Sequence, residues 1–85
     1  GVLSSGSGYA TLNGNNLTSF SPTTGIPSGL QYLGLVNNNI SMSSWNTNTT
    51  WINSAPNNAE IFADNSILGT TTFSLLTSKG WTITI

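Results

Sequence analysis

The chain has 85 residues and only three charged side chains, Glu60, Asp64 and Lys79, for a net charge of −1. It contains neither cysteine nor histidine, which excludes disulfides, thiolate metal sites and the commonest general base. A single basic residue argues against nucleic acid and against an anionic membrane surface as partners. No apolar run approaches the roughly 20 residues of a membrane span. The length predicts one small domain over residues 1–85.

The first predicted strand, near residues 9–13, has a pattern that recurs 23 positions later, near residues 31–36. The spacing predicts that alternate residues of each strand point inward and that the chain then turns. An asparagine in the turn can satisfy backbone groups of its own turn and of the neighbouring one. The matching pairs are Ala10 and Leu33, Leu12 and Leu35, Asn15 and Asn38, and Leu17 and Ile40, with Asn15 and Asn38 as the structural turn positions.

A repeat of this length with the pattern L-x-L-x-x-N-x-L is the signature of leucine-rich repeats, and the sequence resembles that family over these two units. The proline-containing block between and around the strands resembles the repeats of bacterial surface proteins and of phage virion or tail proteins. The resemblance implies an α/β solenoid, a short leucine-rich-repeat-like stack of about four parallel strands with irregular convex arms and one or two short helices. Val2 and Leu3 fit the tail of a preceding unit, so either a longer chain precedes Gly1 or a neighbouring subunit covers this end.

The connection between the first two strands, residues 17–29, is predicted to be an extended arm. Two prolines and two glycines exclude a regular helix there. Phe20 and Ile26 are the expected inward contacts. Residues 44–56 can then hold a short helix with Trp45 or Trp51, together with Ile52, facing the core.

Two registers compete for the third strand, near residues 59–64. One matches Asn65 and Ile67 to the earlier turn but points Glu60 and Phe62 inward. Because burying an unpaired carboxylate costs several kcal/mol, the other register is favoured. It points Ala59, Ile61 and Ala63 inward, places Ser66 in the asparagine position and Leu68 behind it, and leaves Glu60 and Asp64 outside.

The last unit is predicted to contain a helix over residues 73–79 and a strand over residues 81–85. Thr71 or Thr72 would cap the helix, and Gly80 would end it, with Lys79 at the negative end of the helix dipole. The expected buried residues are Phe73, Leu75 and Leu76 in the helix and Trp81, Ile83 and Ile85 in the strand; Thr82 and Thr84 would point outward.

The outward strand positions would form the concave face and are the candidate ligand-binding residues: Tyr9, Thr11, Tyr32, Glu60, Phe62 and Asp64. Tyr9 and Tyr32 are expected to stack on adjacent strands with Phe62 one row across, and Gly34 leaves room for a ring to lie flat. Aromatic rings beside polar groups suit the recognition of a sugar or a protein. The alternative is that these cross-strand rings only stabilise the sheet.

No catalytic constellation is present, and a non-enzymatic protein without metal or cofactor is expected. Glu60 and Asp64 would lie about 13 Å apart along a strand, farther apart than glycosidase carboxylates, and they give too few oxygens for calcium. We expect a virion-associated or extracellular module. It would bind a host glycan or surface protein through its concave face, or serve as a structural element of a phage particle or fibre by contacting copies of itself or neighbouring proteins. A secreted bacterial adhesin is the alternative.

Overall fold

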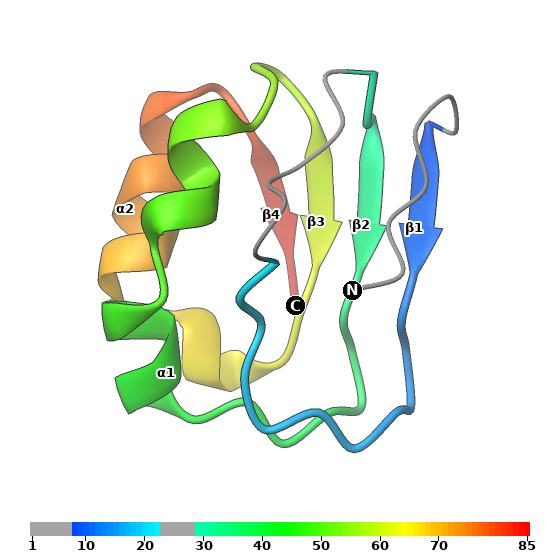
Figure 1. Cartoon of the computed structure of the whole chain (residues 1–85), viewed down its shortest axis with the longest axis vertical. Helices are drawn as coiled ribbons and strands as arrows, with labels where there is room; N and C mark the ends of the chain where they lie inside the picture. Colours follow the sequence, from blue (N-terminus) through cyan, green and yellow to red (C-terminus); the bar gives the residue numbers. More distant parts are fainter. Residues whose placement is uncertain (1–7, 23–28) are drawn as a thin grey trace.

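The computed structural model describes residues 8–22 and 29–85. In chain order it contains β1 (Tyr9–Thr11), β2 (Tyr32–Gly34), α1 (Met42–Thr47), the 3-10 helix η1 (Thr50–Ser54), β3 (Glu60–Phe62), the 3-10 turn η2 (Asn65–Ile67), α2 (Thr71–Ser78) and β4 (Thr82–Thr84) (Figure 1). The strands fall inside the predicted segments, but each is only three residues long.

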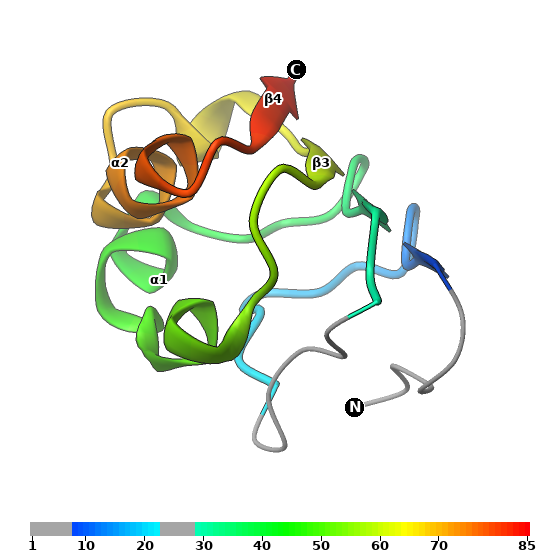
Figure 2. The same ribbon diagram turned by 90° about the horizontal axis from the view of Figure 1, so that it is seen from above.

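The four strands form one parallel sheet in the order β1-β2-β3-β4, so the predicted set of parallel strands in chain order is confirmed. Tyr9, Tyr32, Glu60 and Thr82 occupy one row across the sheet, followed by a row of Ala10, Leu33, Ile61 and Ile83, and then by Thr11, Gly34, Phe62 and Thr84. Parallel neighbours need a long crossover connection. Here the three crossovers carry the 17–29 arm, α1 with η1, and η2 with α2, and both helices lie on the same side of the sheet (Figures 1 and 2). The molecule is a small α/β protein.

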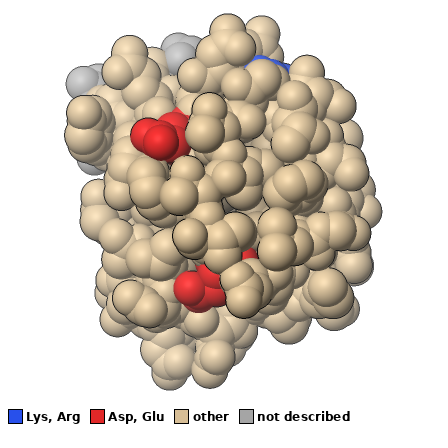
Figure 3. Space-filling view, turned by 180° about the vertical axis from the view of Figure 1, so that it is seen from behind, with Lys and Arg blue, Asp and Glu red and all other residues tan. Residues whose placement is uncertain are grey.

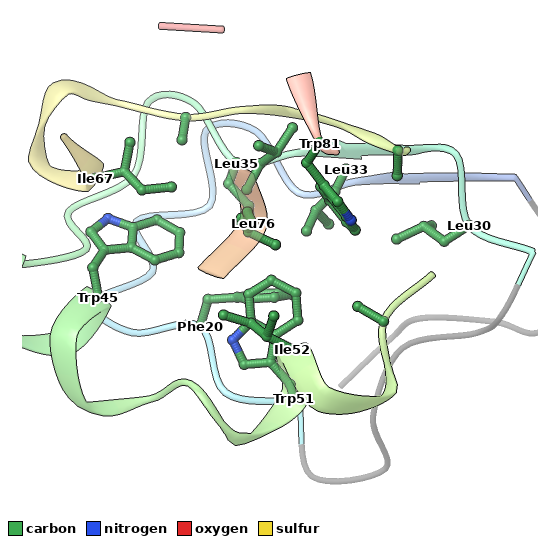
Figure 4. Close-up of a cluster of buried hydrophobic side chains, with 14 of the residues drawn as sticks. Phe20, Leu30, Leu33, Leu35, Trp45, Trp51, Ile52, Ile67, Leu76 and Trp81 are labelled. Carbon is green, nitrogen blue, oxygen red and sulfur yellow. The ribbon is translucent and has the colours of Figure 1, made fainter. Parts of the chain in front are cut away.

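The hydrophobic core lies between the sheet and these connections (Figure 4). Leu33 and Ile61, neighbours in the second row, are completely buried, and Leu35 and Ala63 are 1% exposed. Ala59 is buried as well, which confirms the predicted register of the third strand. The reason is the one anticipated: this register keeps the Glu60 carboxylate out of the core.

The turn after β3 differs from the prediction. Ile67 is completely buried, whereas Leu68, the residue expected in the core, is 44% exposed. From Ala63 to Ile67 is four residues, one fewer than from Leu35 to Ile40, and the tight turn η2 accounts for the shorter path. Ser66 still links the two turns, because its hydroxyl donates to the Ile40 carbonyl (2.6 Å) and accepts from Trp45 Nε1 (3.1 Å).

We call α1, η1 and α2 together the helical layer. It contributes more buried residues to the core than the sequence predicted. Trp45 of α1 and Trp51 of η1 are both buried, where the sequence had offered one or the other, and Ile52 is buried as expected. The ring of Phe20 contacts Trp51 edge-on at a centroid distance of 5.0 Å, which joins the described start of this arm, residues 17–22, to this layer. Ile26, the other expected contact of that arm, and Val2 and Leu3 lie outside the described residues.

In the last unit the helix begins earlier than predicted, and two residues that were predicted to be buried, Leu75 and Ile85, are exposed. Thr70, rather than Thr71 or Thr72, caps α2 by accepting from Phe73 N, so the helix starts two residues earlier than predicted and Thr72 lies inside it. Thr72 is buried and donates to the Trp45 carbonyl, and Leu75 is 38% exposed. Ile85 is 52% exposed because β4 is the last strand of the sheet and no strand beyond it covers this row. Gly80 has a φ of 80°, as expected of a helix-ending glycine.

Candidate functional site

The face of the sheet opposite the helices carries most of the candidate residues. Because side chains alternate along a strand and the row of Leu33 and Ile61 faces the core, the first and third rows must point away from it. We call this surface the sheet face; it consists of Tyr9, Thr11, Tyr32, Gly34, Glu60, Phe62, Thr82 and Thr84. No helix covers it (Figure 2), and Figure 3 shows a surface without basic residues over most of its area, with two separate acidic patches.

Three aromatic rings of the sheet face form a continuous row. The Tyr9 and Tyr32 rings stack with centroids 5.4 Å apart and an interplanar angle of 24°. The Phe62 ring follows at 5.1 Å from Tyr32, tilted by 36°. Tyr9 is 68% exposed, while Tyr32 and Phe62 are half-buried. The structure therefore brings the predicted trio together, and each ring keeps a surface that another molecule can contact.

Gly34 has a different neighbour from the one expected. A Cβ at this position would lie 2.9 Å from Asn13 Oδ1, so the space above the glycine holds the Asn13 amide. The same oxygen accepts from Val36 N at 2.9 Å. Thr11, exposed and in register with Gly34, lies beside this contact. Because Gly34 has no side chain, the Asn13 amide after β1 can reach the backbone N–H of Val36 after β2.

Glu60 lies in the middle of the sheet face. It is half-buried, and its register neighbours are Tyr32 on β2 and Thr82 on β4. Within residues 8–22 and 29–85 its carboxylate has neither a hydrogen bond nor an ion pair. A half-buried carboxylate without an internal partner is available to a ligand.

Asp64 does not belong with the other candidates. It was expected as a second outward charge, but its carboxylate accepts from two successive backbone groups, Asn37 N and Asn38 N, each at 3.0 Å. Asn37 has a φ of 59°, the left-handed conformation that turns consecutive N–H groups toward one anion. Asp64 therefore stabilises the turn that follows β2, a role that its position in the charge pattern does not indicate.

Asn38 connects the turn after β2 with the turn after β1. Its Oδ1 accepts from Asn15 N (3.0 Å) and Leu17 N (2.9 Å), and its Nδ2 donates to the carbonyls of Leu12 (3.0 Å) and Leu35 (2.9 Å). The Asn15 side chain makes only a local bond among the described contacts, from Nδ2 to the Asn13 carbonyl. Asn38 thus satisfies backbone groups of both turns, whereas Asn15 serves its own.

These turns also border a surface depression of about 650 Å³ at the carboxyl ends of β2, β3 and β4. Its lining consists of residues 36–40, residues 63–66 and Ile85. Sequence reasoning did not find it, because its shape depends on two turns of different length. The polar groups that face it include Asp64 and Asn38, which already bond to backbone.

Lys79, the one basic residue, bonds within the helical layer. Its Nζ donates to the carbonyls of Ile52 (2.8 Å) and Ala55 (2.7 Å) and so joins the end of α2 to η1. In the described part of the chain no three Asp, Glu, His or Cys side chains come close enough to hold a metal ion. No helix found there has the length and apolarity needed to cross a bilayer.

No protein-family model, curated protein or solved structure matches this chain. A proposal for its function therefore rests on the geometry of the sheet face and of the turns beside it.

Proposed function

We propose that the chain is a non-catalytic, leucine-rich-repeat-type module, virion-associated or extracellular, that binds a ligand of the host surface, a glycan or a protein, through the sheet face. The observation that carries the proposal is the row of Tyr9, Tyr32 and Phe62 on the sheet face, with centroids 5.4 and 5.1 Å apart, each ring being at least partly exposed. Rigid aromatic rings provide contact area at a low cost in conformational entropy. The neighbouring hydroxyls of Thr11, Thr82 and Thr84 add directional polar contacts.

The repeat character of the proposal is supported by the spacing of the inward row. Successive strands place Ala10, Leu33, Ile61 and Ile83 side by side at intervals of 23, 28 and 22 residues. Each unit therefore adds one strand and one connection to a shared core, which is how stacked repeats bury apolar surface. The bonds of Asn38 to the preceding turn are those expected of the repeat asparagine.

The non-catalytic character is supported by the separate surroundings of the two carboxylates. Asp64 bonds to Asn37 N and Asn38 N, so it does not form a pair with Glu60. Glycoside hydrolysis usually needs two carboxyl groups placed on either side of one bond. Glu60 alone does not supply that arrangement.

Binding of the labelled domain to glycan arrays and to intact cells tests the proposal. Tyr9→Ala and Tyr32→Ala should each lower binding at least about tenfold, as expected for hot-spot aromatics. Thr77→Ala, on the exposed side of α2, is the matched control and should bind like the parent. Undiminished binding by a folded Tyr9→Ala, Tyr32→Ala double variant would contradict the proposal.

A structural role in a phage particle, fibre or surface layer is the second candidate, and a specific observation favours it. Leu68, Leu75 and Ile85 are 44%, 38% and 52% exposed, and all three belong to the last unit, whose strand β4 is at the edge of the sheet. An uncovered strand edge with apolar neighbours is a template for pairing with another chain. Light scattering at micromolar concentration tests this role; the parent should self-associate and Ile85→Lys should not, whereas a monomeric parent contradicts it.

A further inference from the structure

Among the three charged side chains, Glu60 alone has no partner within residues 8–22 and 29–85. Asp64 accepts two backbone hydrogen bonds, and Lys79 donates two. The Glu60 carboxylate has none within the described residues, although the side chain is half-buried and partly desolvated. Partial desolvation strengthens the attraction of such a group for a cation or a hydrogen-bond donor from outside.

Two rings flank this carboxylate. Tyr32 is the register neighbour of Glu60, about 4.8 Å away across the sheet. Phe62 follows on the same face, two residues and about 6.6 Å along β3. Tyr32 and Phe62 share this face with Glu60, so a cation bonded to Glu60 would lie beside two rings, and ring faces attract cations over roughly 6 Å.

The charge distribution favours the same class of ligand. Figure 3 shows both acidic side chains in one view of the molecule. Glu60 lies on the sheet face and Asp64 follows β3, while the Lys79 ammonium is held by carbonyls of the helical layer. The field above the sheet face is therefore negative, which attracts basic partners and repels acidic ones.

We infer that the sheet face takes an arginine side chain of a protein partner, with its guanidinium bonded to Glu60 and in contact with the exposed parts of the Tyr32 and Phe62 rings. This inference rests on the proposed function and narrows its ligand to a protein. Arginine fits better than lysine because its planar guanidinium makes two parallel bonds to a carboxylate and stacks on aromatic rings at the same time. A neutral sugar would stack on the rings but would leave the charge of Glu60 uncompensated.

Calorimetric titration of the whole chain at low salt tests the inference with three probes: acetyl-Gly-Arg-Gly-Arg-Gly-amide, the same peptide with citrulline for arginine, and chitotriose. Citrulline keeps the shape of arginine without its charge. We expect the arginine peptide to bind about tenfold more tightly than the citrulline peptide and chitotriose. Glu60→Gln should lower the affinity for the arginine peptide about tenfold, and Phe62→Leu several-fold.

The double variant Glu60→Gln, Ser74→Glu controls for net charge. Ser74 lies exposed on α2, on the opposite side of the sheet, so the second substitution restores the charge of the chain without restoring the site. We expect no recovery of binding. Recovery, equal affinity for the two peptides, no effect of Glu60→Gln, or no binding of the arginine peptide would each overturn the inference. If chitotriose binds more tightly and Tyr32→Ala abolishes that binding, the inference fails while the proposed function stands.

Discussion

Glu60 and Asp64 lie only four residues apart, yet one belongs to the sheet face and the other to the turns at the carboxyl ends of the strands. Beyond the ends of the strands, backbone N–H groups no longer pair within the sheet and need other acceptors. The side chains of Asn13, Asn38 and Asp64 provide these acceptors. Within the sheet, the backbone groups of neighbouring strands bond to one another. Side chains on the sheet face are therefore not needed as backbone hydrogen-bond partners. The difference shows that backbone requirements decide which polar groups remain available to a ligand.

The largest effect on stability is expected for Asn38→Ala. Its amide makes bonds to Asn15 N, Leu17 N and the Leu12 and Leu35 carbonyls, and losing them should lower the free energy of unfolding by about 3 kcal/mol. Urea unfolding measures this, with Asn39→Ala, an exposed neighbour, as the control. Equal losses in the two variants would show that the turn does not depend on the Asn38 amide.

Asp64→Asn should have the next largest effect. An amide can offer one oxygen where the carboxylate offers two, so one of the N–H groups of Asn37 and Asn38 loses its acceptor, and the charge is lost as well. We expect a loss of about 2 kcal/mol in the free energy of unfolding. Glu60→Gln, measured alongside, should change it by less than about 0.5 kcal/mol. The reverse order would refute the distinction between the two carboxylates.

Gly34→Ala tests the contact between the sheet and the turn after β1, where the Asn13 amide lies against Gly34. The added methyl group must displace the Asn13 amide from 2.9 Å and weaken its bond to Val36 N, at an expected cost of about 1 kcal/mol. Gly29→Ala is the matched control, because nothing lies within 4 Å of the added carbon. Thermal unfolding that does not separate the two variants would contradict the contact.

Tyr9→Ala should change stability less than Asn38→Ala, Asp64→Asn or Gly34→Ala does, and should change binding more than any of them. The ring is 68% exposed and its contact with Tyr32 is worth about 0.5 kcal/mol. Retained stability together with lost cell or glycan binding would assign the ring to recognition. A loss of several kcal/mol, by contrast, would support the alternative that the aromatic row mainly stabilises the sheet.

The sequence predicted the parallel sheet because the alternation of Leu33 and Leu35 recurs at intervals of 23, 28 and 22 residues, and it predicted the third register because a buried Glu60 is too costly. It also placed the aromatic row correctly, since residues two apart on neighbouring strands share a face. It could not predict the burial of Ile67, because that depends on a turn one residue shorter than the earlier ones. It could not predict the role of Asp64, because its partners Asn37 N and Asn38 N belong to another turn. Leu75 was misplaced because the buried side of α2 is set by Thr72 and Leu76, and Leu75 lies about 100° around the helix from Leu76.

A map of backbone amide NMR shifts during titration with the arginine peptide tests whether Glu60, rather than Asp64, is the carboxylate available to a ligand. If Glu60 is the available carboxylate, the largest changes will occur at Tyr32, Glu60 and Phe62, while Asn37 and Asn38 keep their shifts because their N–H groups remain bonded to Asp64. If the largest changes occurred at Asn37, Asn38 and Asp64 instead, the peptide would be competing for the Asp64 carboxylate. That result would contradict the assignment of Glu60 as the available carboxylate.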